Sequence, residues 1–452
     1  MTGARTTAGA TVADGPRPMK EAAGCLVVLG PFFFLSYGFA NWVSAQRTDV
    51  GELVFAWERA IPFLPWTILP YWTIDAFYAA SVFTCRTRAE LHTHVVRLVA
   101  AQVISVTCFL AFPLRFTFDR PATGGLFGAL FDVLADFDKP FNQAPSLHIG
   151  LLVILWVRYA TIVPRAWHWA LNAWAILIAM SVLTTYQHHF IDLPTGLWTG
   201  ALCLWLFPDE PALRPRWQPL ASDPARRRLA LRYALGAVGI GALSLALGGA
   251  ALWLAWAAAA LALVAANYAW IGPAGFQKGT DGRMTVGAVL LFAPYLAGAW
   301  VNSRVWTRGR PKANEVAPGV WLGRFPGPAD LTTLGLKSWV DTTAELPAQA
   351  SAVAYRLAPL LDLVPPTVAE LERAVESVAA LAVARPTLVA CALGYSRSAL
   401  VVAAWTLATG GASDPDAAIA LVERVRPGIV LPGAHRALLR EWHAGRANGV
   451  RR

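Results

Sequence analysis

Charged residues are scarce in this chain. Asp, Glu, Lys and Arg make up 15% of its 452 residues, whereas hydrophobic residues make up 56%. Soluble domains carry about a quarter charged residues, so most of this chain cannot form a solvated surface. Several apolar runs approach the roughly 20 residues that cross a bilayer. The composition therefore excludes an ordinary soluble protein and predicts a polytopic α-helical membrane domain.

Cysteine is also scarce, with five residues in the whole chain. Cys25, Cys85, Cys108 and Cys203 lie in or beside apolar runs and show no paired spacing, so we expect small core residues instead of a disulfide framework. Cys391 alone lies outside the apolar runs. No group of His, Cys, Asp or Glu has metal-ligand spacing, and neither a metal nor another cofactor is expected.

An excess of basic residues gives the chain a formal net charge of +10. Such a charge is compatible with nucleic-acid binding. The arginines, however, lie mainly in short loops between apolar runs, and basic residues gather in this way in the cytoplasmic loops of membrane proteins. We therefore expect no nucleic-acid partner.

Membrane spans are predicted in two groups. An Ala/Thr/Gly-rich tail over 1–22, expected to be disordered, precedes the first group within 23–208. A basic loop over 209–229 separates this group from a second group within 230–304. The spans of the first group are predicted at 23–43, 64–84, 93–113, 146–163, 168–186 and 191–208, and those of the second at 230–248, 250–271 and 285–303.

The basic loops predict the orientation of the chain in its membrane. If the spans of the first group alternate, the tail and the loops at 85–97, 158–167 and 209–229 share one face, which is cytoplasmic by the positive-inside rule. The loops at 114–145 and 187–190 then face the extracytoplasmic side. We expect an integral protein of a plasma membrane, such as the inner membrane of a bacterium.

From Ala313 onward the sequence changes character. Short buried strands are predicted at 320–324, 339–341 and 387–390. Amphipathic helices alternate with these strands and are predicted at 366–383, 398–409, 414–425 and 433–444. This alternation predicts an α/β domain over 313–452.

The first chemical motif follows the last of these strands. Cys391-Ala-Leu-Gly-Tyr-Ser-Arg397-Ser398 spells C-x5-R-S between a buried strand and a helix. A strand-to-helix loop directs backbone N–H groups at an anion, so Gly394, which lets the loop curl, and Ser396 are expected to bind phosphate. Arg397 can grip two phosphate oxygens, and its positive field favours the reactive thiolate of Cys391. Ser398 is placed to hydrogen-bond that thiolate when it leaves.

This motif resembles that of the dual-specificity protein phosphatases, within the tyrosine-phosphatase superfamily. The resemblance covers about residues 313–452 and implies a phosphocysteine intermediate, with an Asp on a separate loop as general acid. Asp362 fits that role. Asp341 is the alternative, although its place between a strand and a turn favours capping. The family usually has His before the nucleophile, where this chain has Ala390.

A second motif lies within the apolar region. Pro145-Ser146-Leu147-His148 is followed by His188-His-Phe-Ile-Asp192. An imidazole nucleophile must be neutral and held in one tautomer, and a carboxylate bonded to its far nitrogen does both. A second imidazole suits protonation of a leaving group. Because polar residues are costly at membrane depth, His148, His188 and Asp192 are functional candidates. His189 lies off this pattern and is expected to be an interfacial residue.

The second motif resembles the type 2 phosphatidic acid phosphatase superfamily, and most closely its inositol-phosphorylceramide-synthase-like branch, over about residues 55–208. The resemblance implies a six-helix core, to which this chain adds about three further spans. It also implies that His188 attacks phosphorus, that Asp192 orients His188, and that His148 protonates the leaving oxygen. Arg120 and Ser146 would hold the phosphoryl oxygens, and Ser181 matches the start of the third motif of the superfamily.

Two cations of the superfamily motifs are missing, because Pro113 and Val182 occupy their positions. Arg115 is a candidate to replace one of them. A monoester dianion needs more positive charge around it than a diester monoanion does. The membrane site is therefore expected to transfer a phosphodiester head group.

Two functions remain open. In the first, a bifunctional enzyme acts on phospholipid head groups within the bilayer, with a His-based membrane site and a Cys-based phosphatase site. In the second, the chain is a protein tyrosine or dual-specificity phosphatase acting on phosphoproteins, and its membrane part is a sensor or anchor. The paired histidine motifs favour the first function. The α/β domain is expected on the cytoplasmic side, and the oligomeric state is left open.

Overall fold

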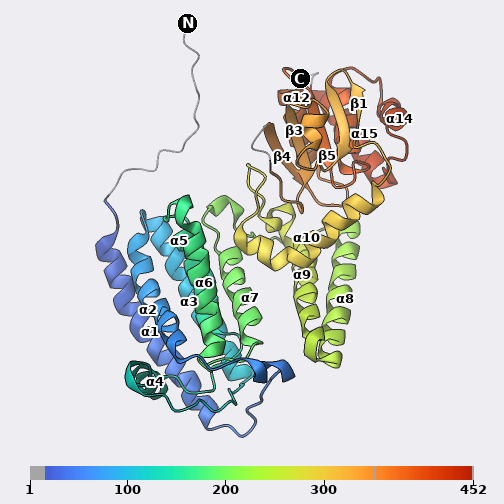
Figure 1. The fold of residues 1–452 in the computed structure, drawn as a ribbon. Helices are drawn as coiled ribbons and strands as arrows, with labels where there is room; N and C mark the ends of the chain where they lie inside the picture. Colours follow the sequence, from blue (N-terminus) through green and yellow to red (C-terminus); the bar gives the residue numbers. More distant parts are fainter. Residues whose placement is uncertain (1–15, 350–352, 450–452) are drawn as a thin grey trace. The chain divides into compact units, whose positions relative to one another are not determined.

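The computed structural model of the chain describes residues 16–349 and 353–449. The chain divides into two compact units, Met1–Asp209 and Glu210–Arg452. The first unit consists of helices, and the second combines long apolar helices with an α/β domain (Figure 1). The predicted disordered tail over 1–22 lies in part outside the described residues. Its last residues were predicted wrongly, because the first helix begins at Met19.

Each span predicted in the first unit overlaps a helix. These helices are α1 (Met19–Ala45), α2 (Ile68–Ser81), α3 (Arg88–Ala111), α5 (Leu147–Ala160), α6 (His168–Thr184) and α7 (Asp192–Leu206). Of these, only α1, α3 and α6 are among the described helices long enough to be candidate membrane spans. Helix α4 (Gly125–Phe137) was not predicted, and it lies within the loop at 114–145. It buries Phe131 and Leu134 on one face and exposes Asp132 and Asp136 on another. This one-sided burial makes α4 a short amphipathic helix.

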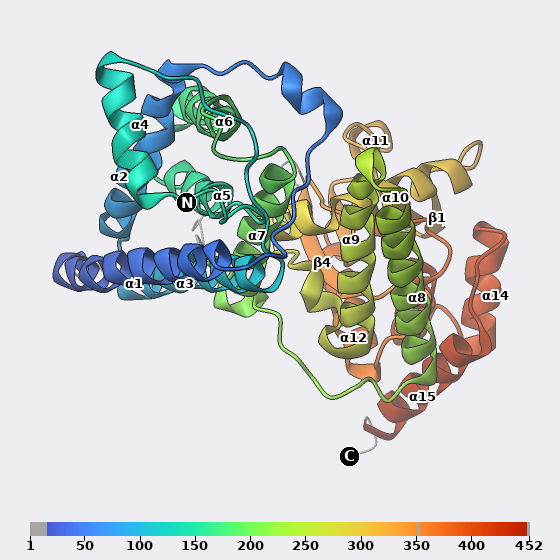
Figure 2. The ribbon, with the colours of Figure 1, turned by 90° about the horizontal axis from the view of Figure 1, so that it is seen from below.

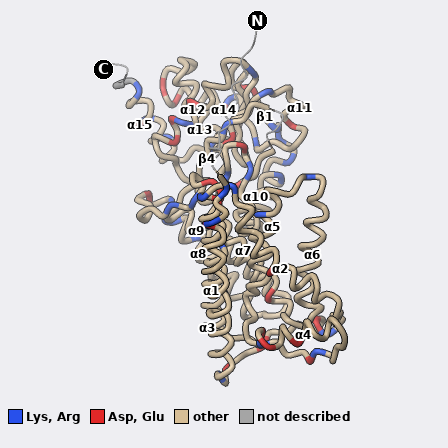
Figure 3. Tube along the Cα trace, turned by 90° about the vertical axis from the view of Figure 1, so that its left-hand side faces the viewer, with Lys and Arg blue, Asp and Glu red and all other residues tan. Residues whose placement is uncertain are grey.

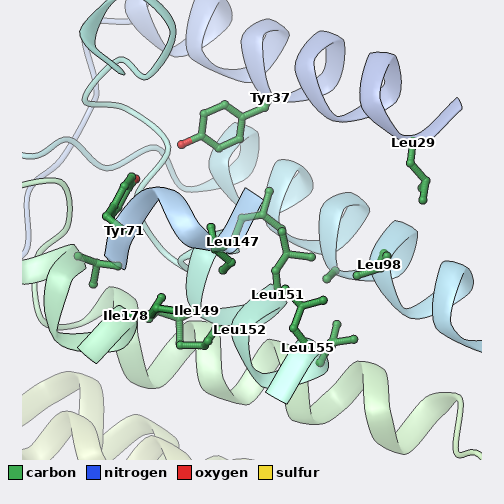
Figure 4. Packing of buried hydrophobic residues seen from close by; sticks show 14 of the residues in the cluster. Leu29, Tyr37, Tyr71, Leu98, Leu147, Ile149, Leu151, Leu152, Leu155 and Ile178 are labelled. Carbon is green, nitrogen blue, oxygen red and sulfur yellow. The ribbon is translucent and has the colours of Figure 1, made fainter. Parts of the chain in front are cut away.

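The core of the first unit consists of apolar side chains from several of its helices (Figure 4). Leu29 and Tyr37 come from α1, Tyr71 from α2, Leu98 from α3 and a row of leucines from α5. Lipid tails are as apolar as leucine, so helices in a bilayer associate through close packing and hydrogen bonds more than through the hydrophobic effect.

Six helices among the described residues are long and apolar enough to cross a membrane. They are Met19–Ala45, Arg88–Ala111, Arg165–Thr184, Pro224–Leu247, Gly249–Ile271 and Val286–Trp306. Figure 3 shows that charged residues are sparse along α1 and α3 and more frequent in the α/β domain and in the loops around α4. By the length and composition of these helices, the chain is a membrane protein with a helical region followed by an α/β domain.

Glycines bring α5 and α7 into backbone contact. A Cβ atom on Gly196 would lie 2.5 Å from the carbonyl oxygen of Ser146, and one on Gly200 would lie 2.6 Å from that of Gly150. Small residues allow such close approach between membrane helices. The contact places Ser146, which caps α5, beside Asp192, which begins α7, and the Ser146 N–H donates to the Asp192 carbonyl at 3.2 Å. Two distant sequence motifs thereby meet.

In the second unit, α8 (Pro224–Leu247) and α9 (Leu254–Ala266) form a hairpin. Its tip contains Gly248 and Gly249, whose φ angles of +57° and +50° favour glycine. Helix α10 (Val286–Trp306) crosses this hairpin instead of running beside it (Figures 1 and 2). The indole N–H of Trp256 on α9 donates to the Leu290 carbonyl on α10 at 2.9 Å.

The α/β domain is built on a five-stranded sheet with the order β1-β2-β5-β3-β4, in which β1 is antiparallel to β2 and the other pairs are parallel. The central strand β5 is completely buried and ends at Cys391, opposite Arg324 on β2. The strands are β1 (Ala313–Ala317), β2 (Val320–Arg324), β3 (Ser338–Thr343), β4 (Ala354–Leu360) and β5 (Thr387–Cys391). The helices are α11 (Asp330–Thr333), α12 (Val368–Ala382), α13 (Arg397–Ala408), α14 (Pro415–Val425) and α15 (Gly433–Gly449).

Strands β2, β3 and β5 and helices α12 to α15 lie where the sequence predicts strands and helices. Strands β1 and β4 were not predicted. Both are edge strands that are only partly buried, so neither shows a continuous buried run in the sequence. Helix α12 begins where predicted because Thr367 caps it: its hydroxyl accepts from the Glu370 N–H, and the Glu370 carboxylate accepts from the Thr367 N–H.

The contact between α5 and α7 gives a first testable prediction. Gly200→Ala should destabilise the protein by about 1–3 kcal/mol, because the added methyl overpacks a backbone contact. Gly38→Ala on α1 is the matched control, since an added Cβ there meets nothing within 4 Å. Thermal unfolding of the full chain in detergent checks this, and equal midpoints for the two variants would contradict the close contact.

Candidate active sites

The first candidate site lies where β5 passes into α13. The Cys391 side chain is buried, and two donors point at its sulfur: the Gly394 N–H at 3.2 Å and the Ser398 hydroxyl at 3.2 Å. Gly394 has a φ of +77°, and a Cβ there would lie 2.4 Å from the carbonyl carbon of Gly323. The curl of the loop therefore requires glycine at this position. Ser396 is the last loop residue before the helix.

Arg397 is buried at the start of α13, and its charge is held by two carboxylates. Its two terminal nitrogens donate to the two Glu345 carboxylate oxygens at 2.8 and 2.7 Å, and one of them also donates to the Leu360 carbonyl at 3.0 Å. Burial raises the pKa of Glu345, but the charge of Arg397 and the hydrogen bonds it donates bring that pKa below its ordinary value. Glu345 thus stays ionised and fixes the guanidinium.

Asp362 faces the third nitrogen of Arg397. Its carboxylate lies 3.1 Å from Nε, at ion-pair distance, yet the N–H is not directed at it and has no hydrogen-bond partner among the described residues. That buried N–H is therefore available to a phosphate oxygen. Burial raises the pKa of Asp362, and the positive charge of Arg397 opposes the shift. A partly exposed carboxyl with a raised pKa suits a general acid.

Asp341, the alternative acid, is occupied elsewhere. It is fully buried, and its carboxylate accepts from Lys278 Nζ at 2.6 Å and the Tyr355 hydroxyl at 2.9 Å. The N–H and hydroxyl of Thr343 both donate to its other oxygen at 2.8 Å. Asp341 is thus half of a buried ion pair and not a simple cap, and Asp362 is the better candidate for the acid.

Several residues that support this site carry no signal in the sequence. Arg426 is buried and donates to the Gly394 carbonyl at 2.7 Å, so it braces the loop from behind. Its guanidinium also lies over the Tyr395 ring, 4.5 Å from the centroid. Ala390 stands where the dual-specificity phosphatases usually have histidine. Its backbone carbonyl accepts a hydrogen bond from the Thr342 hydroxyl at 2.9 Å. No local pattern marks these contacts, because their partners lie far apart in sequence.

The second candidate site lies in the first unit, at the N-terminal ends of α5 and α7. His188 Nδ1 lies 3.0 Å from the Asp192 carboxylate, and both side chains are buried. The other ring nitrogen, Nε2, lies 3.4 Å from the Ser146 hydroxyl. A carboxylate on Nδ1 holds the ring in the tautomer that leaves Nε2 free to attack. The structure therefore brings together three of the residues that the sequence singles out.

His148 lies on the first turn of α5 and stacks on the Tyr71 ring at 4.3 Å between centroids. Its Nε2 is buried and has no hydrogen-bond partner among the described residues. The Tyr71 hydroxyl donates to Asp138 at 3.4 Å, and the Tyr37 hydroxyl donates to the other oxygen of the same carboxyl at 2.8 Å. Burial raises the pKa of Asp138, and the nearby His188 opposes the shift. Asp138 is an additional acidic group of this site that no sequence motif indicated.

The residues predicted to hold phosphoryl oxygens lie in different settings. Arg120 is half-buried, with its guanidinium 4.7 Å from the centroid of the Phe131 ring. Arg115 is exposed and forms no ion pair among the described residues. The Ser181 hydroxyl donates to the Ile178 carbonyl of its own helix at 2.7 Å. Arg120 is thus the arginine with a defined position, and Ser181 supports helix α6.

His189 was predicted wrongly as an interfacial residue. It is buried, and its Nδ1 lies 3.0 Å from the Glu58 carboxylate. The Thr117 N–H donates to its Nε2 at 3.2 Å, so Nδ1 carries the hydrogen that Glu58 accepts. The ring also packs against Phe116 and Phe118. His189 therefore connects its own loop to the segments that carry Glu58 and Thr117. Its neighbours in sequence do not indicate these contacts.

No group of three or more His, Cys, Asp or Glu side chains that could hold a metal ion occurs among the described residues. One site combines a thiol, a buried arginine and an acid, and the other combines two imidazoles with carboxyl groups.

Among solved structures, the chain is similar to several phosphatases. Tk-PTP in its active form is 24% identical over 30% of this chain and 97% of its own, with a TM-score of 0.28. PTPMT1 is 19% identical over 31% of this chain and 99% of its own, with a TM-score of 0.28. Human DUSP28 is 26% identical over 30% of this chain and 96% of its own, with a TM-score of 0.27. A scan of protein-family models and a search of curated proteins gave no match.

Proposed function

We propose that this chain is a membrane-bound phosphatase that hydrolyses phosphate monoesters through a phosphocysteine at Cys391. The arrangement around the thiol carries the proposal. Two donors point at the sulfur, and the next helix begins with a buried arginine whose Nε–H has no hydrogen-bond partner among the described residues. Hydrogen-bond donors and a nearby positive charge favour the thiolate, which is the nucleophilic form.

In the proposed reaction, the Cys391 thiolate attacks phosphorus and the bond between phosphorus and the ester oxygen breaks. The leaving oxygen takes the proton of Asp362. Arg397 and the N–H groups of the loop hold the phosphoryl oxygens. Water then attacks the phosphocysteine and gives a proton to the Asp362 carboxylate. The sulfur–phosphorus bond breaks, Ser398 donates to the departing thiolate, and inorganic phosphate is released.

The contacts at the two ends of α10 support a position of the α/β domain on the cytoplasmic side. Lys278, ahead of α10, binds Asp341 of the domain, and Ser303 in its last turns donates to Ala392 of the same domain. A folded domain lies on one side of a membrane, so α10 begins and ends on that side. The last predicted span would then not cross, and the domain would share the face of the basic loop at 209–229.

A site held this close to membrane helices suits a phosphorylated head group of a phospholipid in the same membrane. The alternative substrate is a phosphoprotein, in which case the membrane part is an anchor or sensor. Comparing a phosphorylated lipid in vesicles with a phosphotyrosine peptide distinguishes the two, because only the lipid is held in the same membrane as the enzyme.

For the first unit we propose a second activity, the transfer of a phospho head group through His188. Its Nε2 would attack phosphorus and release the lipid alcohol, whose oxygen takes a proton from His148. An acceptor hydroxyl would then attack the phosphohistidine and give up its proton to His148. The buried pair of His188 and Asp192 supports this proposal.

The charge of the membrane site favours a substrate with a single negative charge. Asp138 adds an acidic group near the ring of His148, and the exposed Arg115 contributes no ion pair there among the described residues. An unpaired charge in a medium of low dielectric is expensive. A phosphodiester should therefore be accepted more readily than a dianionic monoester.

Replacing the thiol tests the first activity. The full chain should hydrolyse an aryl phosphate without added metal, and Cys391→Ser should reduce the rate by several orders of magnitude while the thermal unfolding midpoint stays unchanged. The nucleophile is lost, but a side chain of similar size remains. Turnover that persists in this variant, or that stops on addition of a chelator, would refute the assignment.

The raised pKa of Asp362 predicts the pH dependence of the same reaction. Asp362 acts as an acid only when protonated, so kcat should fall as pH rises through its pKa, and the fall should occur at higher pH than for an ordinary Asp. Asp362→Asn should remove this limb and slow poor leaving groups by about 10²-fold or more, since general acids contribute about that much. A uniform loss across leaving groups would indicate structural damage instead.

Head-group transfer should depend on the membrane site alone. His188→Ala and His148→Ala should abolish transfer from a radiolabelled phosphodiester lipid and leave aryl phosphate hydrolysis unchanged. Asp138→Asn should raise the rate on phosphatidic acid relative to the diester, because the amide cannot carry a negative charge, whereas the exposed Asp136→Asn serves as control. Protein with Cys391 replaced that hydrolyses phosphatidic acid but no diester would contradict the proposed substrate charge.

A further inference from the structure

We infer that the segment from Asn267 to Arg304, here called the connecting segment, is part of the phosphatase site and positions its reacting groups. The segment contains the end of the α8–α9 hairpin, the loop at 272–285 and most of α10. Hydrogen bonds from this segment reach three parts of the site. They are the end of β3 together with Glu345 and Arg397 (the arginine clamp), the turn at Asp362 (the acid loop) and the loop that follows Cys391 (the cysteine loop). The inference rests on the proposed phosphatase function and adds positioning residues that lie outside the α/β domain.

Lys278 supports the arginine clamp. Its ammonium group is buried and donates to Asp341 at 2.6 Å, to the Thr343 hydroxyl at 3.0 Å and to the Thr343 carbonyl at 3.1 Å. All three bonds fix the end of β3. Glu345 lies two residues after Thr343, and its carboxylate accepts hydrogen bonds from both terminal nitrogens of Arg397. Lys278 therefore positions the Glu345 carboxylate, which in turn orients the guanidinium of Arg397.

Tyr268 supports the acid loop. It lies at the end of the α8–α9 hairpin, is fully buried, and its hydroxyl donates to the Asp362 carbonyl at 3.0 Å. The next residue, Leu363, has a φ of +61°, a conformation that non-glycine residues seldom adopt. The bond from Tyr268 holds the backbone of the acid at this turn. The direction of the Asp362 side chain thus depends on a residue of the membrane hairpin.

Ser303 supports the cysteine loop. Its hydroxyl donates to the Ala392 carbonyl at 2.5 Å, and the neighbouring Arg304 donates to the Phe325 carbonyl at 2.9 Å. In a trans peptide the carbonyl and the following N–H point in opposite directions. Anchoring the Ala392 carbonyl on α10 therefore turns the Leu393 N–H away from α10, as an anion-binding loop requires.

The inference is tested on the full chain in phospholipid vesicles, with aryl phosphates of good and poor leaving groups. Tyr268→Phe should slow poor leaving groups by about tenfold and leave good ones unchanged, because it disturbs only the acid, whose full contribution is about 10²-fold or more. Ser303→Ala should weaken the inhibition by inorganic phosphate and raise KM, because it loosens the anion loop. The thermal unfolding midpoints of Tyr268→Phe and Ser303→Ala should stay close to that of the wild type.

Lys278→Met leaves Asp341 buried without a partner and is expected to unfold part of the protein. The double variant Lys278→Met, Asp341→Asn removes both charges and separates folding from positioning: it should fold, yet lose about tenfold or more in kcat/KM, because misplaced groups reduce rates steeply. Arg283→Met in the same loop and Asn302→Ala beside Ser303 are matched controls, since both wild-type side chains are exposed.

The outcomes separate this inference from the proposed function. If the wild type is inactive, or if Cys391→Ser retains activity, the proposed function fails. If the wild type is active and Tyr268→Phe, Ser303→Ala and the double variant all match their controls at equal stability, the function stands and the positioning role is wrong. A uniform loss with all substrates, in proportion to lost stability, would also refute positioning.

Discussion

The buried charge of Arg397 is the constraint around which the phosphatase site is built. A guanidinium removed from water costs several kcal/mol unless it is paired and hydrogen-bonded. Both oxygens of Glu345 accept from the terminal nitrogens of the guanidinium, and the Leu360 carbonyl accepts from one of them. An oxygen of Asp362 lies at ion-pair distance from the third nitrogen. The segments carrying these groups must hold their places for the charge to remain buried. Burial of one arginine thus couples the segments that follow β3 and end β4 to the start of α13.

The two candidate sites have a similar arrangement of nucleophile and helix but differ in charge. In each, a nucleophile lies at the N-terminal end of a helix, where backbone N–H groups and the helix dipole favour an anion. The thiol site adds a buried arginine, whereas the membrane site adds the carboxyl of Asp138. The difference would divide substrates by charge: a dianionic monoester for Cys391 and a monoanionic diester for His188.

The sequence predicted what depends on neighbouring residues. Strand β5, its loop and helix α13 lie where the C-x5-R-S motif places them, because a local pattern defines all three. Glu345 and Lys278 were not predicted, since their partners lie far along the chain and no spacing connects them. Helix α10 was predicted as a span from its apolar composition, which does not show where its two ends lead. His189 was misjudged because the residue that determines its setting, Glu58, lies in another loop.

The order of the chain gives the connecting segment a further consequence. Domains fold as they are synthesised, N-terminal parts first, so Lys278 leaves the ribosome before any strand of the sheet. Its ion pair with Asp341 can form only when β3 arrives. The sheet therefore completes its core against a surface that membrane insertion has already set. A chain whose connecting segment fails to reach its place would leave Asp341 as an unpaired carboxylate in the core of the domain.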